Sequence, residues 1–128
     1  MREENEQQLT ILINTKYARI TIHRHTLRAL GDPTYIHWGY HPQNKVLLLF
    51  GNENGMSNAL KVYFTQKGTC YIHSKALIEG LHRASGAMPV QGSYLLFGKM
   101  DEKLSAISFP LERAKRLLHQ PDELTEKD

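Results

Sequence analysis

The chain contains a single cysteine, Cys70, and no long hydrophobic run. One thiol cannot form an internal disulfide, so the core alone must hold the fold together. The longest apolar run, Val46 to Phe50, has the length of a buried strand and falls far short of the about 18 residues that a membrane-spanning helix needs. The N-terminus also lacks the basic and then apolar pattern of a secretory signal. These absences predict a cytoplasmic protein with no membrane partner.

Catalytic sequence motifs are missing as well. No Walker loop, no Gly-x-Ser-x-Gly elbow and no His-Glu-x-x-His motif occurs. Cys70 and His73 lie near each other in sequence, but Cys70 falls at an apolar strand position and is expected in the core. Paired carboxylates are missing from the expected core, which argues against glycoside hydrolysis. We therefore expect no enzymatic activity and no cofactor.

Seven histidines are many for 128 residues, and four of them, His23, His25, His37 and His41, lie in the first half. His23 and His25 would share a face of a continuing strand, and an imidazole pair can bind zinc or nickel. The dense His, Cys and Asp spacing of a structural zinc site is missing, however. The sequence predicts no metal site and places these histidines at the surface and on edge strands.

Charge is distributed unevenly along the chain. Both tails are acidic, whereas the segment from Leu9 to His119 carries 14 Lys and Arg against 6 Asp and Glu, a net charge of about +8. A basic body attracts polyanions by counterion release. Many small proteins are basic without binding nucleic acid, so charge indicates a partner only weakly.

One sequence pattern occurs twice. The segment 20–23 (Ile-Thr-Ile-His) recurs fifty residues later as segment 70–73 (Cys-Tyr-Ile-His), and in both copies a leucine follows four residues after the histidine. Each copy continues into an aromatic–aliphatic pair, at 35–36 and at 94–95, and ends in a polar turn with lysine before an apolar strand. Each unit is too small to bury its own core, so the repeat predicts one pseudo-symmetric domain.

The expected organisation is an acidic, disordered tail over 1–8, a single domain over 9–119 and an acidic tail over 120–128. Within the domain, repeat one covers 17–51 and repeat two covers 69–109. A helix is expected from Thr26 with Gly31 as its C-cap, and another over 75–84 with Ser74 as its N-cap. Pro110 stands where a helix favours proline, so a short C-terminal amphipathic helix is expected over 110–119.

Alternating apolar residues predict eight short strands around these helices. The strands are expected at 9–13, 17–23, 35–40, 45–50, 59–64, 69–73, 94–100 and 104–109. Short strands leave exposed edges unless the sheet curls on itself. We therefore expect a β-rich α+β fold in which internally duplicated β-α-β-β units form a small barrel, followed by the short C-terminal helix.

The first unit resembles the swapped-hairpin domain of AbrB-like and MazE-like bacterial transcription factors. The resemblance is carried by an Arg-Ile-x-Ile strand, a single helical turn ending in Leu-Gly, and a lysine before an aliphatic third strand. The matching residues are Arg19, Ile20, Ile22, Arg28, Leu30, Gly31, Lys45, Val46 and Leu48. The resemblance implies a barrel of the cradle-loop type and implies that Arg19 and Arg28 face DNA. His23 stands where the family usually has proline.

The resemblance and the basic charge together predict a small DNA-binding regulator of transcription, bacterial or from a mobile element. Its contacts with double-stranded DNA are expected at Arg19, Arg24, Arg28 and, in the second copy, Lys67 and Lys75. The alternative is a non-enzymatic adaptor or inhibitor that binds a protein through the barrel surface or the C-terminal helix. An oligomeric scaffold is a third hypothesis, and the chain is expected to be a monomer or a homodimer.

Two further segments have the composition of nucleic-acid contacts. The stretch 35–41 interleaves Tyr and Trp with His, and such aromatic side chains can stack on bases. Packing between strands is the more common use of such a stretch. A second such segment contains Arg113, Lys115 and Arg116, which can bind phosphates. Basic residues also occur on the solvent-exposed face of a helix without any ligand.

Overall fold

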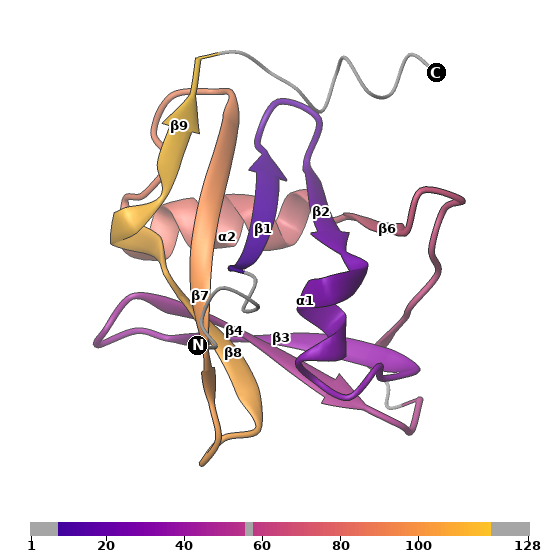
Figure 1. Ribbon diagram of the computed structural model, residues 1–128. Coiled ribbons are helices and arrows are strands. Elements are labelled where there is room, and N and C mark those ends of the chain that lie inside the picture. The colour runs from indigo at the N-terminus through magenta and orange to yellow at the C-terminus, as the bar shows by residue number, and fades with distance from the viewer. Residues whose placement is uncertain (1–7, 56–57, 119–128) are drawn as a thin grey trace, which may run out of the picture.

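The computed structural model describes residues 8–55 and 58–118, which form a curled antiparallel sheet with few helices (Figure 1). Within these residues, the strands are β1 (Leu9–Asn14), β2 (Arg19–His23), β3 (Tyr35–His41), β4 (Val46–Asn52), β5 (Leu60–Lys61), β6 (Thr69–His73), β7 (Ser93–Asp101), β8 (Ala106–Pro110) and β9 (Lys115–Leu117). The helices are α1 (Arg24–Arg28) and α2 (Lys75–Ser85), and a 3-10 turn, η2, covers Leu111–Arg113. The predicted β-rich, barrel-like class is confirmed.

The strands form one sheet in the order β5-β3-β4-β8-β7-β1-β2-β6, and β9 pairs with β7 beside this path. The segment after β5 brings the two ends of the path together. The backbone N–H of Val62 donates to the carbonyl of Thr34 next to β3, and that of Thr65 donates to the carbonyl of Thr69 at the start of β6. This segment therefore links the first and last strands of the path, which is why the sheet is barrel-like.

Strand β7 belongs to both halves of the sheet, and Figure 1 shows it running from one half to the other. Its first residues pair with β1 and β9, and its last three pair with β8. Gly98 lies where the partner changes, and a Cβ at this position would be 2.6 Å from Phe109 Cε1 and 2.7 Å from Ile107 Cγ2. Only glycine allows so close an approach between the strand and the core.

Alternate side chains of the strands fill the core. In β1 and β2, Ile11 lies opposite Ile22 and Ile13 lies opposite Ile20, and all four are buried. Cys70 lies opposite Ile22 on β6 and is also buried, as its apolar position predicts. Helix α2 adds Ile78 and Leu81 to the same cluster. Each such residue contributes about 1.5–3 kcal/mol through removal of apolar surface from water.

The predicted helix caps are found in the structure. The Ser74 hydroxyl accepts a hydrogen bond from the backbone N–H of Leu77 at 3.2 Å, so Ser74 is the N-cap of α2. After α1, the backbone N–H of Gly31 donates to the carbonyl of Arg28 and that of Asp32 donates to the carbonyl of Leu27. These two bonds, with Gly31 at a φ of 85°, satisfy the last helical carbonyls.

The prediction of a C-terminal helix over 110–119 is wrong for the described part of that segment. Pro110 ends β8, a single 3-10 turn follows, and β9 pairs with the free side of β7, with Ser93 opposite Leu117. A ten-residue helix has little stability of its own, whereas this pairing satisfies backbone groups along β7. The turn is held by Leu111, which is buried and whose N–H donates to the carbonyl of Lys45. His119 and the C-terminal tail lie outside the described residues, as does the N-terminal tail up to residue 7.

None of the helices in the described ranges is long and apolar enough to cross a membrane.

Candidate nucleic-acid interface

The five residues predicted to contact DNA lie around one pair of strands. Strands β2 and β6 pair antiparallel, with Arg19 opposite His73, Thr21 opposite Tyr71, and His23 opposite Thr69. The residues between them, such as Ile20 and Ile72, point into the core, so these three pairs lie on the outward side. On that side His23 and His73 are exposed, whereas Arg19, Thr21 and Thr69 are buried within the surface. The predicted basic residues lie at the two ends of this outward side.

The first end of the strand pair contains Arg24, Arg28 and Lys67, which we call the first basic cluster. The backbone N–H of Arg24 donates to the carbonyl of Gly68 at 3.0 Å, so the start of α1 is held against the turn that contains Lys67. Arg28 follows Arg24 by one helical turn and shares its side of α1. All three side chains are exposed. The Arg24 guanidinium also lies 4.0 Å from the centre of the Phe64 ring.

The second end contains Lys16, His73 and Lys75, which we call the second basic cluster. Here the backbone N–H of Ser74 donates to the carbonyl of Ala18 at 3.0 Å, so the start of α2 is held against the turn that contains Lys16. Lys75 Nζ lies 3.9 Å from Glu79 Oε2, but both side chains are exposed and such a pair is weak. Sequence reasoning missed Lys16, because its place beside Lys75 depends on this contact between distant segments.

Arg19 differs from the other predicted contacts because only 8% of it is exposed. Its guanidinium lies 5.1 Å from the centre of the Tyr71 ring on the neighbouring strand. The side chain is on the outward side, as the family resemblance implies, but it is packed into that surface. Direct contact of Arg19 with DNA stays a prediction.

The two basic clusters are separated by the length of the strands. β2 and β6 have five residues each, which at about 3.3 Å per residue puts their ends roughly 17 Å apart. Three of the six carboxylates between Leu9 and His119, those of Asp101, Glu102 and Glu112, belong to the end of β7, the turn after it and η2. Strand β1 separates β7 from β2 along the sheet, and Asp101 is in the part of β7 that pairs with β8 and not with β1. The basic ends therefore lie away from these carboxylates.

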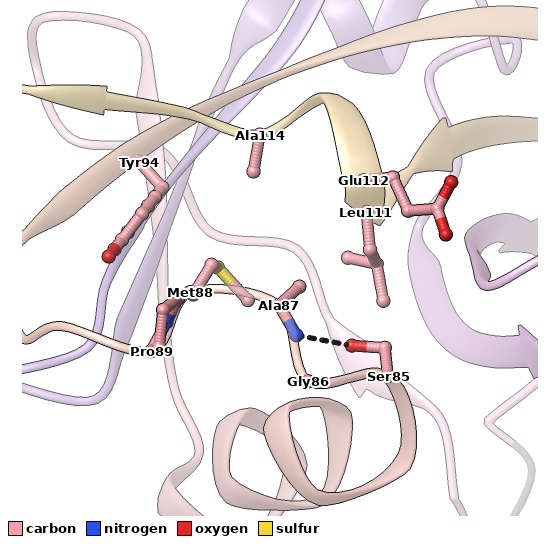
Figure 2. Close-up of a pocket in the computed structure, with 9 residues that line it drawn as sticks. All are labelled: Ser85, Gly86, Ala87, Met88, Pro89, Tyr94, Leu111, Glu112 and Ala114. Atoms are coloured by element: carbon pink, nitrogen blue, oxygen red, sulfur yellow. Dashed lines mark hydrogen bonds between the residues drawn. The ribbon is translucent and has the colours of Figure 1, made fainter.

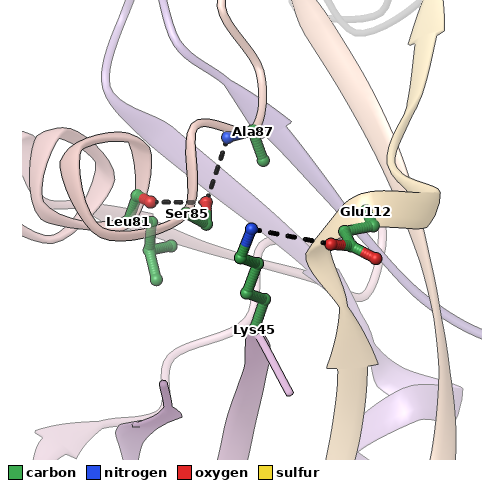
Figure 3. Close-up of polar contacts among 5 residues, drawn as sticks. All are labelled: Lys45, Leu81, Ser85, Ala87 and Glu112. Atoms are coloured by element: carbon green, nitrogen blue, oxygen red, sulfur yellow. Dashed lines mark hydrogen bonds and ion pairs between the residues drawn. The ribbon is translucent and has the colours of Figure 1, made fainter. Parts of the chain in front are cut away.

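A cavity of about 320 Å³ lies between the C-terminal end of α2 and η2 (Figure 2). Met88, which lines it, is buried and has an unusual φ of 56°, and four of the nine lining residues are small. The Ser85 hydroxyl donates to the carbonyl of Leu81 and accepts from the N–H of Ala87 (Figure 3). Glu112 beside the cavity pairs with Lys45 at 3.7 Å, and both side chains are partly exposed. The Ser85 hydroxyl is therefore engaged by the backbone, and Glu112 is the carboxylate that lines the cavity.

The histidines of the described segments do not gather into a metal centre. The rings of His23 and His25 stack with centroids 6.3 Å apart, and His25 Nε2 lies 2.8 Å from the backbone carbonyl oxygen of Gln8. Among residues 8–55 and 58–118, no group of three or more His, Cys, Asp or Glu side chains has the spacing to hold a metal ion.

The aromatic stretch 35–41 is used mainly for packing. Trp38 and Tyr40 pack against the core, and His37 stacks on Phe50 of the neighbouring strand with ring centroids 4.7 Å apart. The side chains of this stretch are half-buried, apart from Ile36, which is buried, and His41, which is exposed. This arrangement agrees with the packing interpretation of the stretch.

No protein-family model, no curated protein and no solved structure matches this chain. Its function is therefore argued from its own residues.

Proposed function

We propose that this protein binds double-stranded DNA through the outward side of the β2–β6 pair, as a small transcriptional regulator of AbrB-like type, bacterial or from a mobile element. The observation that supports this best is the placement of exposed cations at both ends of that pair. The first basic cluster lies at one end and the second at the other, roughly 17 Å apart. The major groove is about 12 Å wide, so the two clusters can reach phosphates on both of its sides.

Charge supports the same proposal. The segment from Leu9 to His119 has a net charge of about +8, and half of its carboxylates are on or next to the β7–β8 hairpin. Phosphate contacts release counterions from the duplex, and each contact adds about 0.9 to the slope of log affinity against log salt. The five exposed Lys and Arg residues of the two clusters together predict a slope of about −4 to −5.

We also infer that the chain is an internal duplication whose two units are related by a pseudo-twofold axis between Thr21 and Tyr71. Two backbone hydrogen bonds support this inference, because Arg24 to Gly68 and Ser74 to Ala18 become equivalent when residue numbers shift by fifty. The φ angles of Ala18 and Gly68, 55° and 78°, agree with it as well.

The second halves of the two units become equivalent when residue numbers shift by sixty, and this equivalence supports the same axis. β4 pairs with β8 so that Leu48 lies opposite Ser108, and the residues just before these strands, Lys45 and Ser105, have φ angles of 55° and 53°. This alignment matches Ile36 with Leu96, both fully buried, instead of the predicted match of 35–36 with 94–95. A duplicated chain needs no second copy, so light scattering should give the mass of a monomer; a dimer would count against this inference.

The DNA proposal is tested by fluorescence anisotropy with a labelled random-sequence duplex at increasing salt. The double variant Arg24→Ala with Lys67→Ala should weaken binding and reduce the salt slope by about 2. The matched control is Lys99→Ala with Lys103→Ala, which removes the same charge from exposed positions of the β7–β8 hairpin. Absence of duplex binding at low salt, or equal losses in both double variants, would overturn the proposal.

A protein-binding adaptor or inhibitor is the second candidate function. Val46, Leu48 and Phe50 point outward from β4 and are half-buried, which leaves an apolar strip on the barrel surface. A C-terminal helix cannot serve as this surface over 111–117, because η2 and β9 form that segment. A protein that binds no duplex DNA at low salt would favour this candidate, and Leu48→Asp should then abolish complex formation with its partner.

A further inference from the structure

Cations and aromatic rings alternate on one part of the surface. Among the described residues, four cation–aromatic contacts are found in segments 16–24 and 61–71: two join one segment to the other, and each segment contains one more. These segments are far apart in the sequence and meet through the pairing of β2 with β6. Among the described residues, the cation–aromatic contacts are therefore concentrated on one surface and are not spread around the barrel.

Three of these contacts involve tyrosine rings, and we call these three tyrosines and their cations the tyrosine patch. Lys16 Nζ lies 5.4 Å from the Tyr17 ring centre, Arg19 lies 5.1 Å from that of Tyr71, and Lys61 Nζ lies 5.6 Å from that of Tyr63. Tyr17 is two residues before Arg19 on the approach to β2. Tyr71 directly follows Cys70, whose thiol has a hydrogen bond with the Tyr63 backbone. The patch thus crosses from the turn before β2, over β6, to the segment after β5.

Two rings of the patch are offered to solvent. Tyr63 is 70% exposed and Tyr17 is 49% exposed, whereas Tyr71 is half-buried between them. Phe64, the ring of the fourth contact, differs because it is packed against the core and has Arg24 directly over it. The turn that carries Tyr17 is fixed, since its backbone N–H donates to Asn14 Oδ1 at 3.0 Å. The exposed rings are therefore held by ordered backbone.

An exposed aromatic ring with an ammonium group beside it matches the chemistry of an unpaired nucleotide. The ring stacks on the base, and the cation meets the phosphate. Bases inside a duplex are paired and stacked on one another, so they cannot use such rings. Tyr63 lies beside Cys70, which is opposite Ile22, whereas Tyr17 comes five residues before Ile22. The two rings are therefore roughly 10 Å apart across the strands and up to roughly 16 Å apart along them, so they suit bases a few nucleotides apart on one extended strand.

We infer that the tyrosine patch binds unpaired bases of single-stranded nucleic acid, with Tyr17 and Tyr63 as stacking platforms and with Lys16 and Lys61 at the phosphates. This inference rests on the proposed nucleic-acid-binding function and extends it to a strand that is melted or unpaired.

The experiment measures binding of labelled oligothymidine and oligouridine, and of the random-sequence duplex, by fluorescence anisotropy. The double variant Tyr17→Ala with Tyr63→Ala should weaken binding of the single strands by roughly 5-fold or more for each ring. It should bind the duplex as the wild type does, because the first basic cluster is intact. The two oligonucleotides distinguish a DNA strand from an RNA strand as the source of the bases.

Two control variants make the test specific. Tyr63→Phe keeps the ring and should retain single-strand binding, and Phe97→Ala removes an exposed ring from β7, outside the patch, and should change nothing. Wild-type affinity of the double variant for both single strands, or a loss in Tyr63→Phe equal to that in Tyr63→Ala, overturns the inference. Duplex binding without single-strand binding overturns this inference alone. Single-strand binding without duplex binding overturns the duplex proposal alone.

Discussion

The backbone N–H of Ser74 donates a hydrogen bond to the carbonyl of Ala18 at 3.0 Å, and this contact ties the start of α2 to the turn before β2. Ala18 has a φ of 55°, in the left-handed region that residues with a side chain rarely adopt. Gly68 accepts the corresponding bond from Arg24 with a φ of 78°. The same backbone geometry is thus made once by alanine and once by glycine, on either side of the candidate interface.

This difference predicts stability changes of opposite sign. Ala18→Gly relieves the left-handed strain and should raise the free energy of unfolding by about 0.5–1 kcal/mol. Gly68→Ala introduces that strain and should lower it by about 1 kcal/mol or more. The added Cβ at Gly68 would be 3.6 Å from Arg24 Nε, an ordinary contact, so the loss comes from the backbone. Urea denaturation of both variants measures the two changes; the same sign in both would contradict the prediction.

Two other glycines predict a second contrast. Gly98→Ala forces a Cβ to within 2.6 Å of buried Phe109 and should lower the free energy of unfolding by about 1–3 kcal/mol or more. Gly80 lies inside α2 with no atom within 4 Å of an added Cβ, so Gly80→Ala should raise stability by up to about 1 kcal/mol. Thermal denaturation followed by circular dichroism compares the two. A neutral Gly98→Ala would mean that β7 does not bend against β8 as described.

Much of the fold follows from local sequence patterns. Alternation in β1 and β2 places Ile11, Ile13, Ile20 and Ile22 in the core, and Ser74 is recognisable as a cap from its position before an apolar helical stripe. The alternation also puts Arg19 on the outward side. What it cannot show is that Tyr71, fifty residues away, packs against that side chain.

The failures come from long-range pairing. The segment after Pro110 has apolar residues at helical spacing, and nothing local reveals that the edge of β7 is free to pair with it. In the same way, Lys16 and Tyr63 have no local signal as site residues. Their positions depend on a turn docked against α2 and on a segment linked to both β3 and β6. Sequence patterns therefore predicted the strands better than they predicted which side chains share a surface.

The path of the C-terminal segment gives a test that separates strand from helix. On a helix, Leu111 and Leu118 would share the apolar face, and truncation of either would be costly. In the structure Leu111 is 1% exposed and Leu118 is 85% exposed. Leu111→Ala should therefore cost about 2–5 kcal/mol, whereas Leu118→Ala should change stability by less than about 0.5 kcal/mol. Urea denaturation measures both, and comparable losses would favour the helix.

Burial of Cys70 predicts a dependence of stability on pH. Burial raises the pKa of the Cys70 thiol above its ordinary value, and a hydrogen bond from the Tyr63 backbone only partly opposes this. The unfolded chain, with a thiol pKa of about 8.5, then releases its proton first as the pH rises. The contribution of this pKa difference to the free energy of unfolding is fully present below that pH. It is lost as the pH rises through the pKa of the folded state. Cys70→Val removes this titration, so the wild type should lose more stability than the variant between neutral and alkaline pH. Parallel stability curves for the two proteins over that range would show that the thiol does not titrate differently on folding, and Cys70 would then not be held in the apolar core.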